Sequence, residues 1–134
     1  MAKPYVHAES SVKHFKVGKP EDYLDIHTFM DSTKASYPNI KNRMFTHNSW
    51  FIKEVLPRVF GQYRMVDGVK ISIEAIGEQH VLEDFRGSIP TPQDWCNALA
   101  FESWMNNGLT KPASSRNNVV STTETYKNEE CPSE

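Results

Sequence analysis

The chain has 134 residues, with 15 Lys and Arg, 17 Asp and Glu, and a formal net charge of −2. This length suits one domain, and the near-neutral charge gives no electrostatic basis for binding duplex nucleic acid or an anionic membrane. No run of roughly 18 apolar residues is present, so no membrane-spanning helix is expected, and the N-terminus lacks an apolar signal-peptide core.

The apolar pattern divides the chain into two parts. Residues 1–105 carry periodic apolar positions and all three Trp residues, which predicts a single helical domain. Residues 106–134 are rich in Ser, Thr and Asn and cannot bury enough apolar surface to offset their ordering entropy, so we expect a flexible polar tail. Cys96 lies in the first part and Cys131 in the second, which favours two reduced thiols and a cytoplasmic setting.

Helix signals begin near the N-terminus, where residues 7–16 form a short candidate helix. Lys19-Pro20-Glu21-Asp22 is typical of a helix start, because Pro suits the first helical position and acidic residues suit the first turn. Pro38 precedes the longest apolar pattern, which we expect to form the central helix, with Pro57 ending or kinking it and Gly61 as a stop. The predicted helices cover residues 21–35, 38–56, 74–85 and 92–100.

A different pattern interrupts the helices at residues 62–73. Gln62–Val66 and Val69–Ile73 flank Asp67-Gly68, a dipeptide that favours the type I′ turn of a β-hairpin. A lone hairpin is marginally stable in water and must pack on the helices. The predicted fold class is therefore mainly α: a compact helical domain with one small β-hairpin.

Two His–Asp pairs share one spacing. His27 is followed four residues later by Asp31, and His80 by Asp84. On a helix, positions i and i+4 share a face, so each pair can offer an imidazole nitrogen and a carboxylate oxygen to one ion, or the carboxylate can orient the imidazole. Two such pairs on facing helices would form a site for Zn, Mn, Fe or Ni. Such pairs also occur by chance on solvated helix faces, which leaves a structural alternative open.

Three other residues are candidates for the same site. His47 follows Arg43 by four residues, so the two share a polar stripe, and we interpret His47 as a general acid or base and Arg43 as an anion clamp. His7 is a candidate additional metal ligand, whereas His14 is expected to be exposed. Zincin, paired-cysteine zinc, phosphate-loop and nucleophile-elbow motifs are all missing from the sequence.

Several segments resemble an uncharacterised family of small bacteriophage and bacterial proteins. The resemblance covers most of residues 5–105 and includes His7, His27, Asp31, His47, His80 and Asp84. It implies a bacterial or phage-infected host cytosol but no catalytic role. The segments that carry it are His7–Val12, Lys19–His27, Asp31–Lys34, Arg43 with His47-Asn48, Gly77–Asp84 and Ile89–Thr91.

Two functions fit these observations. The first is a metal-dependent hydrolase, acting on a nucleotide or another phosphate ester, in which an ion lowers the pKa of a bound water. The second is a non-enzymatic phage or bacterial protein that sequesters a host protein or a small ligand, with the same polar residues as a binding surface or a buried network.

Overall fold

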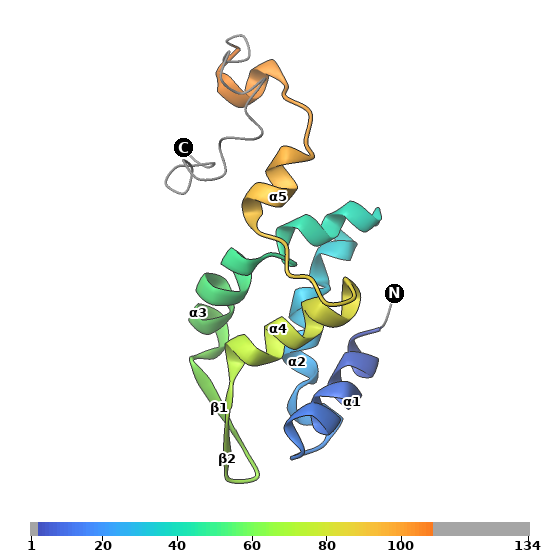
Figure 1. Ribbon diagram of the computed structural model, residues 1–134, viewed down its shortest axis with the longest axis vertical. Helices are drawn as coiled ribbons and strands as arrows, with labels where there is room; N and C mark the ends of the chain where they lie inside the picture. Colours follow the sequence, from blue (N-terminus) through green and yellow to red (C-terminus); the bar gives the residue numbers. More distant parts are fainter. Residues whose placement is uncertain (1–2, 109–134) are drawn as a thin grey trace. The chain divides into compact units, whose positions relative to one another are not determined.

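The computed structural model describes residues 3–108, and the predicted mainly-α fold with one small hairpin is confirmed (Figure 1). The chain divides into two compact units, Met1–Thr91 and Pro92–Glu134. Of the tail predicted over residues 106–134, residues 109–134 lie outside the described residues, and the domain boundary at residue 105 stays a prediction. None of the helices in the described residues has the length and apolar character needed to cross a membrane.

The first unit opens with α1, Pro4–Phe15, which is longer than the predicted helix over residues 7–16 suggests. Pro4 occupies the first helical position, where its missing N–H costs no hydrogen bond. The helix ends at Lys16, whose backbone is left-handed with φ of 61° and whose N–H donates to the Val12 carbonyl. Its buried residues are His7, Ala8 and Ser11, so α1 turns a partly polar face inward.

The helix predicted over residues 21–35 is broken into three pieces. α2, Leu24–Met30, lies between two 3₁₀ turns, Pro20–Asp22 and Ser32–Ala35. Polar side chains bond the local backbone at both breaks: the Lys19 N–H donates to the Asp22 carboxylate at 2.9 Å, and the Ser32 hydroxyl donates to the Phe29 carbonyl at 2.7 Å. The segment is largely helical, as predicted, but Tyr23 and Asp31 divide it into three pieces.

The central helix predicted over residues 38–56 is not continuous but consists of two separate helical runs. A 3₁₀ helix covers Ile40–Phe45, and a second helical run follows as a π-helical turn, Phe51–Val55, continuing into α3, Leu56–Phe60. Asn48 begins the second run, because its side-chain oxygen accepts the Phe51 N–H at 2.9 Å. Pro57 lies inside that run, and the π-turn precedes it where the missing proline N–H disturbs the usual pattern. Gly61, with φ of 92°, ends α3 as predicted.

The predicted hairpin and the helix after it are present. β1, Tyr63–Val66, pairs antiparallel with β2, Val69–Ser72, and Asp67 and Gly68 form the turn with φ of 48° and 82°. α4, Ile73–Asp84, follows at once, and the Ser72 hydroxyl caps it by accepting the Ala75 N–H at 3.2 Å. In the second unit, α5 covers Pro92–Asn97, shorter than the predicted 92–100, and a 3₁₀ turn covers Ser103–Asn106.

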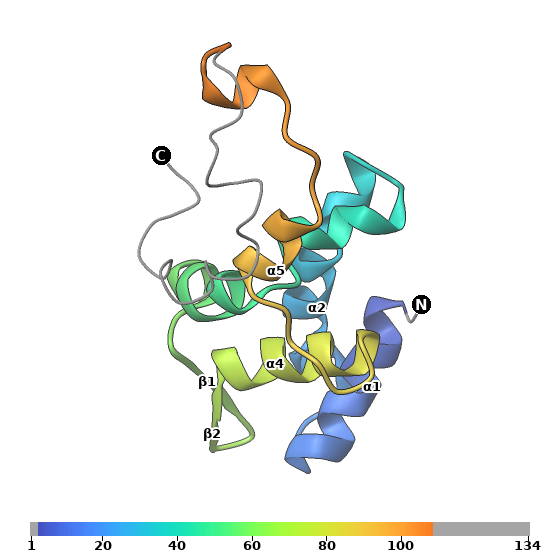
Figure 2. The same cartoon turned by 45° about the horizontal axis from the view of Figure 1, so that its top comes forward.

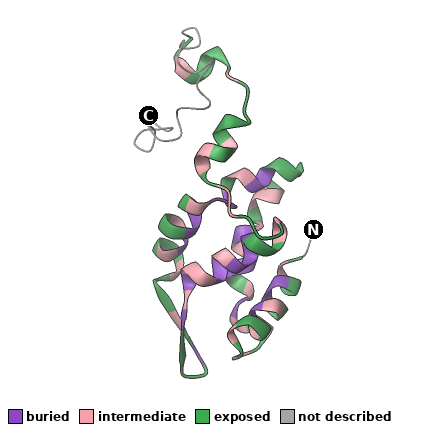
Figure 3. Ribbon diagram, in the orientation of Figure 1, coloured by how far each residue is buried: buried purple, intermediate pink, exposed green. Residues whose placement is uncertain are grey.

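Helices α1, α2 and α4 pack against one another, and both views show them side by side (Figures 1 and 2). Their inward faces carry about half of the buried residues of the first unit (Figure 3). The apolar core lies beside a second buried group that consists of histidines, since His7, His27, His47 and His80 are each at most 1% exposed. The apolar core is Ala8, Tyr23, Ile26, Met30, Phe51, Ile52, Leu56, Val66, Ile71, Ile73, Ile76 and Val81.

Candidate metal centre

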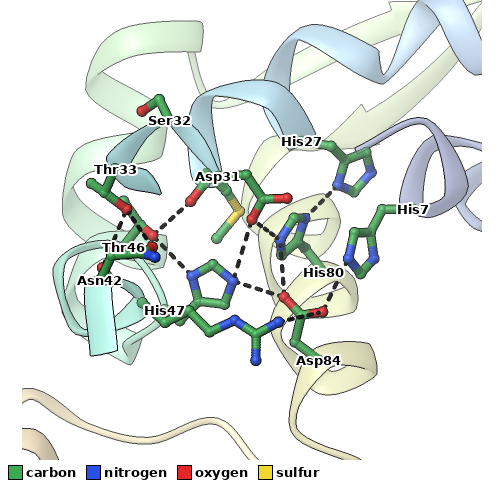
Figure 4. A network of polar contacts seen from close by, with 12 residues as sticks. His7, His27, Asp31, Ser32, Thr33, Asn42, Thr46, His47, His80 and Asp84 are labelled. Atoms are coloured by element: carbon green, nitrogen blue, oxygen red, sulfur yellow. Dashed lines mark hydrogen bonds and ion pairs between the residues drawn. The ribbon is translucent and has the colours of Figure 1, made fainter. Parts of the chain in front are cut away.

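A cluster of histidines and carboxylates lies where α1, α2, α4 and residues 40–47 meet (Figure 4). Each element contributes side chains because of its own local pattern. On α4, positions 80 and 84 share a face, and Asp31 follows directly after the last residue of α2. The members, in chain order, are His7, His27, Asp31, Arg43, His47, His80 and Asp84.

Four of these side chains bring one ligand atom each to a common point. The atoms are Asp31 Oδ1, His47 Nε2, His80 Nε2 and Asp84 Oδ2, and all lie within 4.8 Å of one another. The nitrogen–oxygen separations range from 2.9 Å, between His47 and Asp84, to 3.8 Å, between His47 and Asp31. A tetrahedral ion with bonds near 2.1 Å requires ligand separations of about 3.4 Å, so one ion can contact all four atoms.

A hydrogen-bond relay fixes which nitrogen of His47 carries its proton. The Thr46 hydroxyl lies 2.7 Å from the Met30 carbonyl and 2.8 Å from His47 Nδ1. The carbonyl only accepts, so Thr46 donates to it and accepts the Nδ1–H of His47. Neutral His47 then presents a bare Nε2 lone pair to Asp84.

A longer relay does the same for His80. Gln79 Nε2 donates to the His7 carbonyl at 3.2 Å, which orients the amide so that its oxygen accepts the Ser11 hydroxyl. Ser11 therefore accepts from His27 Nε2 at 2.8 Å, and His27 Nδ1 accepts from His80 Nδ1 at 2.9 Å. Neutral His80 presents a bare Nε2 to Asp31 and Asp84, at 3.2 and 3.3 Å.

When both rings are neutral, two imidazole lone pairs face two carboxylates in a buried site. Lone pairs and carboxylate oxygens repel at these distances unless a cation lies between them. Side-chain exposure is 1% for His47, 0% for His80, 3% for Asp84 and 10% for Asp31, so water screens the repulsion poorly. The donor set of two imidazoles and two carboxylates therefore fits a divalent metal ion.

The directions of the pKa shifts also indicate that the two carboxylates favour a positive charge between them. Burial alone would lower the pKa of His80, but Asp31 and Asp84 outweigh it and raise that pKa, so a proton takes the place of an ion. Burial would raise the pKa of Asp84, but the imidazoles of His47, His7 and His80 beside it hold that pKa well below its usual range. Burial, together with the charges of His80 and His7, lowers the pKa of His27 to about 2, which keeps His27 neutral.

Burial also lowers the pKa of His47, and the neighbouring Asp84 carboxylate offsets this only in part. His47 is therefore neutral near pH 7, as its bare Nε2 requires. His7 completes the cluster on the α1 side: its Nδ1 lies 2.8 Å from Glu83 Oε1 and its Nε2 lies 3.2 Å from Asp84 Oδ1. Ser10 donates to the other oxygen of Glu83.

The structure brings all seven sequence candidates into one neighbourhood but arranges them differently from the two-pair prediction. His27 lies behind His80 and contacts its Nδ1, whereas His47, predicted as an acid or base, places Nε2 among the four converging ligand atoms. His7 contacts Asp84 through the oxygen that does not face those atoms, and His14 is exposed.

Sequence reasoning missed the residues that orient the imidazoles. Thr46 and Gln79 are each adjacent in sequence to a histidine of the cluster, and Ser11 lies one helical turn after His7. Because a hydroxyl or amide beside a histidine is common in any sequence, only the i, i+4 spacing of Ser11 carried a signal, and it was a weak one.

The comparisons with known proteins identify a family. The family described as "Domain of unknown function (DUF6915)" matches residues 2–105. The chain belongs to this family. All the cluster residues lie within the matched range. No curated protein and no solved structure matches the chain.

Proposed function

We propose that this DUF6915 chain is a metal-dependent hydrolase that holds one divalent ion through Asp31, His47, His80 and Asp84. One observation supports the proposal: two relays place a proton on Nδ1 of each imidazole, so both Nε2 atoms face two buried carboxylates. A cation between these atoms, either a divalent ion or a proton in its place, stabilises that arrangement. The ligand spacing suits tetrahedral Zn²⁺, and the mixed nitrogen and oxygen donors also suit Mn²⁺, Fe²⁺ and Ni²⁺.

The ion would supply hydrolytic chemistry by lowering the pKa of a bound water toward neutrality. The substrate class that we propose is a phosphate ester, such as a nucleotide. One water is consumed for each ester bond that breaks: its oxygen joins phosphorus, and a proton goes to the leaving oxygen. In this proposal His27 and Thr46 position the two imidazoles, and the setting is the cytosol of a bacterium or a phage-infected host.

A second function is supported by the closed character of the site. Four protein ligands complete a tetrahedral coordination, which is typical of structural zinc, whereas catalytic zinc keeps one position for water. In that case the chain is a binding protein that sequesters a host protein or small ligand, and the ion stabilises its fold.

The test uses the full chain purified without a nickel column. We expect about one Zn, Mn, Fe or Ni ion per chain by elemental analysis, and metal-dependent cleavage of bis(p-nitrophenyl) phosphate or p-nitrophenyl phosphate. His80→Ala should lose both, and His14→Ala, which removes an exposed histidine from α1, should keep both. A metal-loaded chain that cleaves neither ester supports the binding protein. A chain that takes up none of these ions contradicts both functions.

A further inference from the structure

Arg43 and Arg64 of the first unit both lie against carboxylates, and they differ sharply in how many partners their guanidinium groups have. Arg64, whose side chain is 23% exposed, donates to both oxygens of Asp25 at 2.6 and 2.9 Å and to the Asp22 carbonyl at 3.0 Å. Arg43 is more buried, with a side chain 10% exposed, yet among residues 3–108 its only ionic contact is Asp84 Oδ1 at 3.5 Å.

The guanidinium of Arg43 is therefore a buried group with unused donors. It carries five N–H donors and is always charged, and none of them makes a hydrogen bond to another of the described residues. Its remaining contact is the Phe85 ring, 5.4 Å from Cζ, which accepts no conventional hydrogen bond. Buried donors without acceptors are costly, so a missing acceptor is the simplest explanation of the arrangement.

The charges around the metal centre indicate the sign of that acceptor. The two carboxylates of Asp31 and Asp84 face the ion position and balance the charge of a divalent ion. The Arg43 charge is then uncompensated once an ion is bound, and a buried uncompensated charge attracts an anion.

The location of Arg43 relates that anion to the metal centre. The His47 N–H donates to the Arg43 carbonyl at 2.7 Å, so the two residues are one helical turn apart and project from the same segment. The guanidinium contacts one oxygen of Asp84 while the other oxygen faces the ion position. Arg43 and Asp31, each with a 10% exposed side chain, are the most accessible of the groups around that position.

We infer that Arg43 forms an oxyanion subsite beside the metal ion, and that its ligand is a phosphoryl group. A guanidinium presents two parallel N–H donors, which match two oxygens of a tetrahedral phosphoryl group. A neutral amide offers only one oxygen acceptor and no negative charge. The inference rests on the proposed function, since it takes the ion as bound, and it identifies the end of the substrate that the protein holds.

The test uses the full chain loaded with Co²⁺, whose visible absorption reports changes at the ion, and inorganic phosphate as the probe. Phosphate should change the wild-type spectrum in a saturable way. In Arg43→Gln, one Co²⁺ per chain should remain, and half-saturation should require at least about tenfold more phosphate, as expected for a lost charged bidentate contact. Arg64→Gln removes the arginine that already donates to Asp25 and Asp22, and it should bind phosphate with the wild-type affinity.

Arg43→Lys keeps the charge opposite Asp84 without the two-pronged donor, and should bind phosphate with intermediate affinity. If Arg43→Gln fails to fold, the phosphate affinity of Arg43→Lys tests the subsite instead. Equal phosphate affinity in wild type and Arg43→Lys, or a wild-type spectrum that ignores phosphate, overturns the subsite. Loss of Co²⁺ from a folded Arg43→Gln overturns it too, since Arg43 is then only a counter-charge for Asp84. Failure of the wild type to bind Co²⁺ is a different result, because it refutes the metal centre itself.

Discussion

The Thr46 hydroxyl lies 2.8 Å from His47 Nδ1 while it donates to the Met30 carbonyl at 2.7 Å. Thr46 is 3% exposed, so water does not readily replace it. We predict that Thr46→Val, which keeps the shape and removes the hydroxyl, weakens metal affinity about 10- to 100-fold, because the imidazole loses the partner that fixes its tautomer and orientation. Competition with a chromophoric chelator measures the change.

Two variants control for the loss of a hydroxyl as such. Thr46→Ser retains the acceptor and should bind metal like the wild type. Thr33→Val removes a hydroxyl that donates to Asn42, outside the set of converging ligand atoms, and should also leave metal affinity unchanged. Equal affinity in Thr46→Val and wild type would mean that Thr46 does not orient His47.

A second prediction separates a ligand from the residue that orients it. His80→Ala should abolish binding, because it removes one of four ligand atoms. His27→Ala should weaken binding about 10- to 100-fold, since His80 Nδ1 loses its acceptor at 2.9 Å. The double variant should match His80→Ala, because effects within one site are not additive. Isothermal calorimetry measures the metal affinities. A His27→Ala chain that binds as little metal as His80→Ala would indicate that His27 is itself a ligand.

The difference between these two histidines shows what the sequence does and does not predict. The His80–Asp84 pair was predicted from its spacing, and within α4 the two side chains lie 3.3 Å apart. The His27–Asp31 pair has the same spacing, but α2 ends at Met30, and Asp31 leaves helical geometry with ψ of 3°. The side chain of His27 therefore turns to His80, and spacing alone cannot predict a helix end of this kind.

His47 shows a second limit. The four-residue spacing of Arg43 and His47 was sufficient to select both residues as site candidates, because this spacing is a local pattern. Its place among the ligand atoms depends on the break between the 3₁₀ helix and Asn48, and on contacts to α2 and α4. Contacts between segments distant in sequence are decided by tertiary packing, which local propensity does not encode. The hairpin was predictable because Asp67-Gly68 fixes its turn locally.

A third prediction concerns the packing of α4 on α3. A Cβ added at Gly77 would lie 2.5 Å from Leu56 Cδ1 and 3.4 Å from Ile52 Cγ2, and both side chains are at most 1% exposed. We predict that Gly77→Ala lowers the free energy of unfolding by about 1 to 2 kcal/mol, because overpacking outweighs the better helix propensity of Ala. Denaturant unfolding measures it. In a Leu56→Val background, which removes the clashing methyl, the cost should shrink or change sign; the same cost there would contradict the clash.

The last prediction links the ion to folding. Asp31 and Asp84 both face the His47 and His80 nitrogens at one point in the first unit, so an ion that fills this point should stabilise the native state far more than the unfolded chain, whose ligands are dispersed. At an ion concentration about 100-fold above Kd, the gain is about 2.7 kcal/mol. For a folded region of this size that corresponds to a rise in Tm of about 10 °C or more. Calorimetry in Zn²⁺ and in EDTA measures it. Asp84→Asn should abolish the rise, because the amide is a poor ligand, whereas His14→Ala should retain it. A Tm that is the same with Zn²⁺ and with EDTA in the wild type would show that the cluster is a buried polar network without an ion.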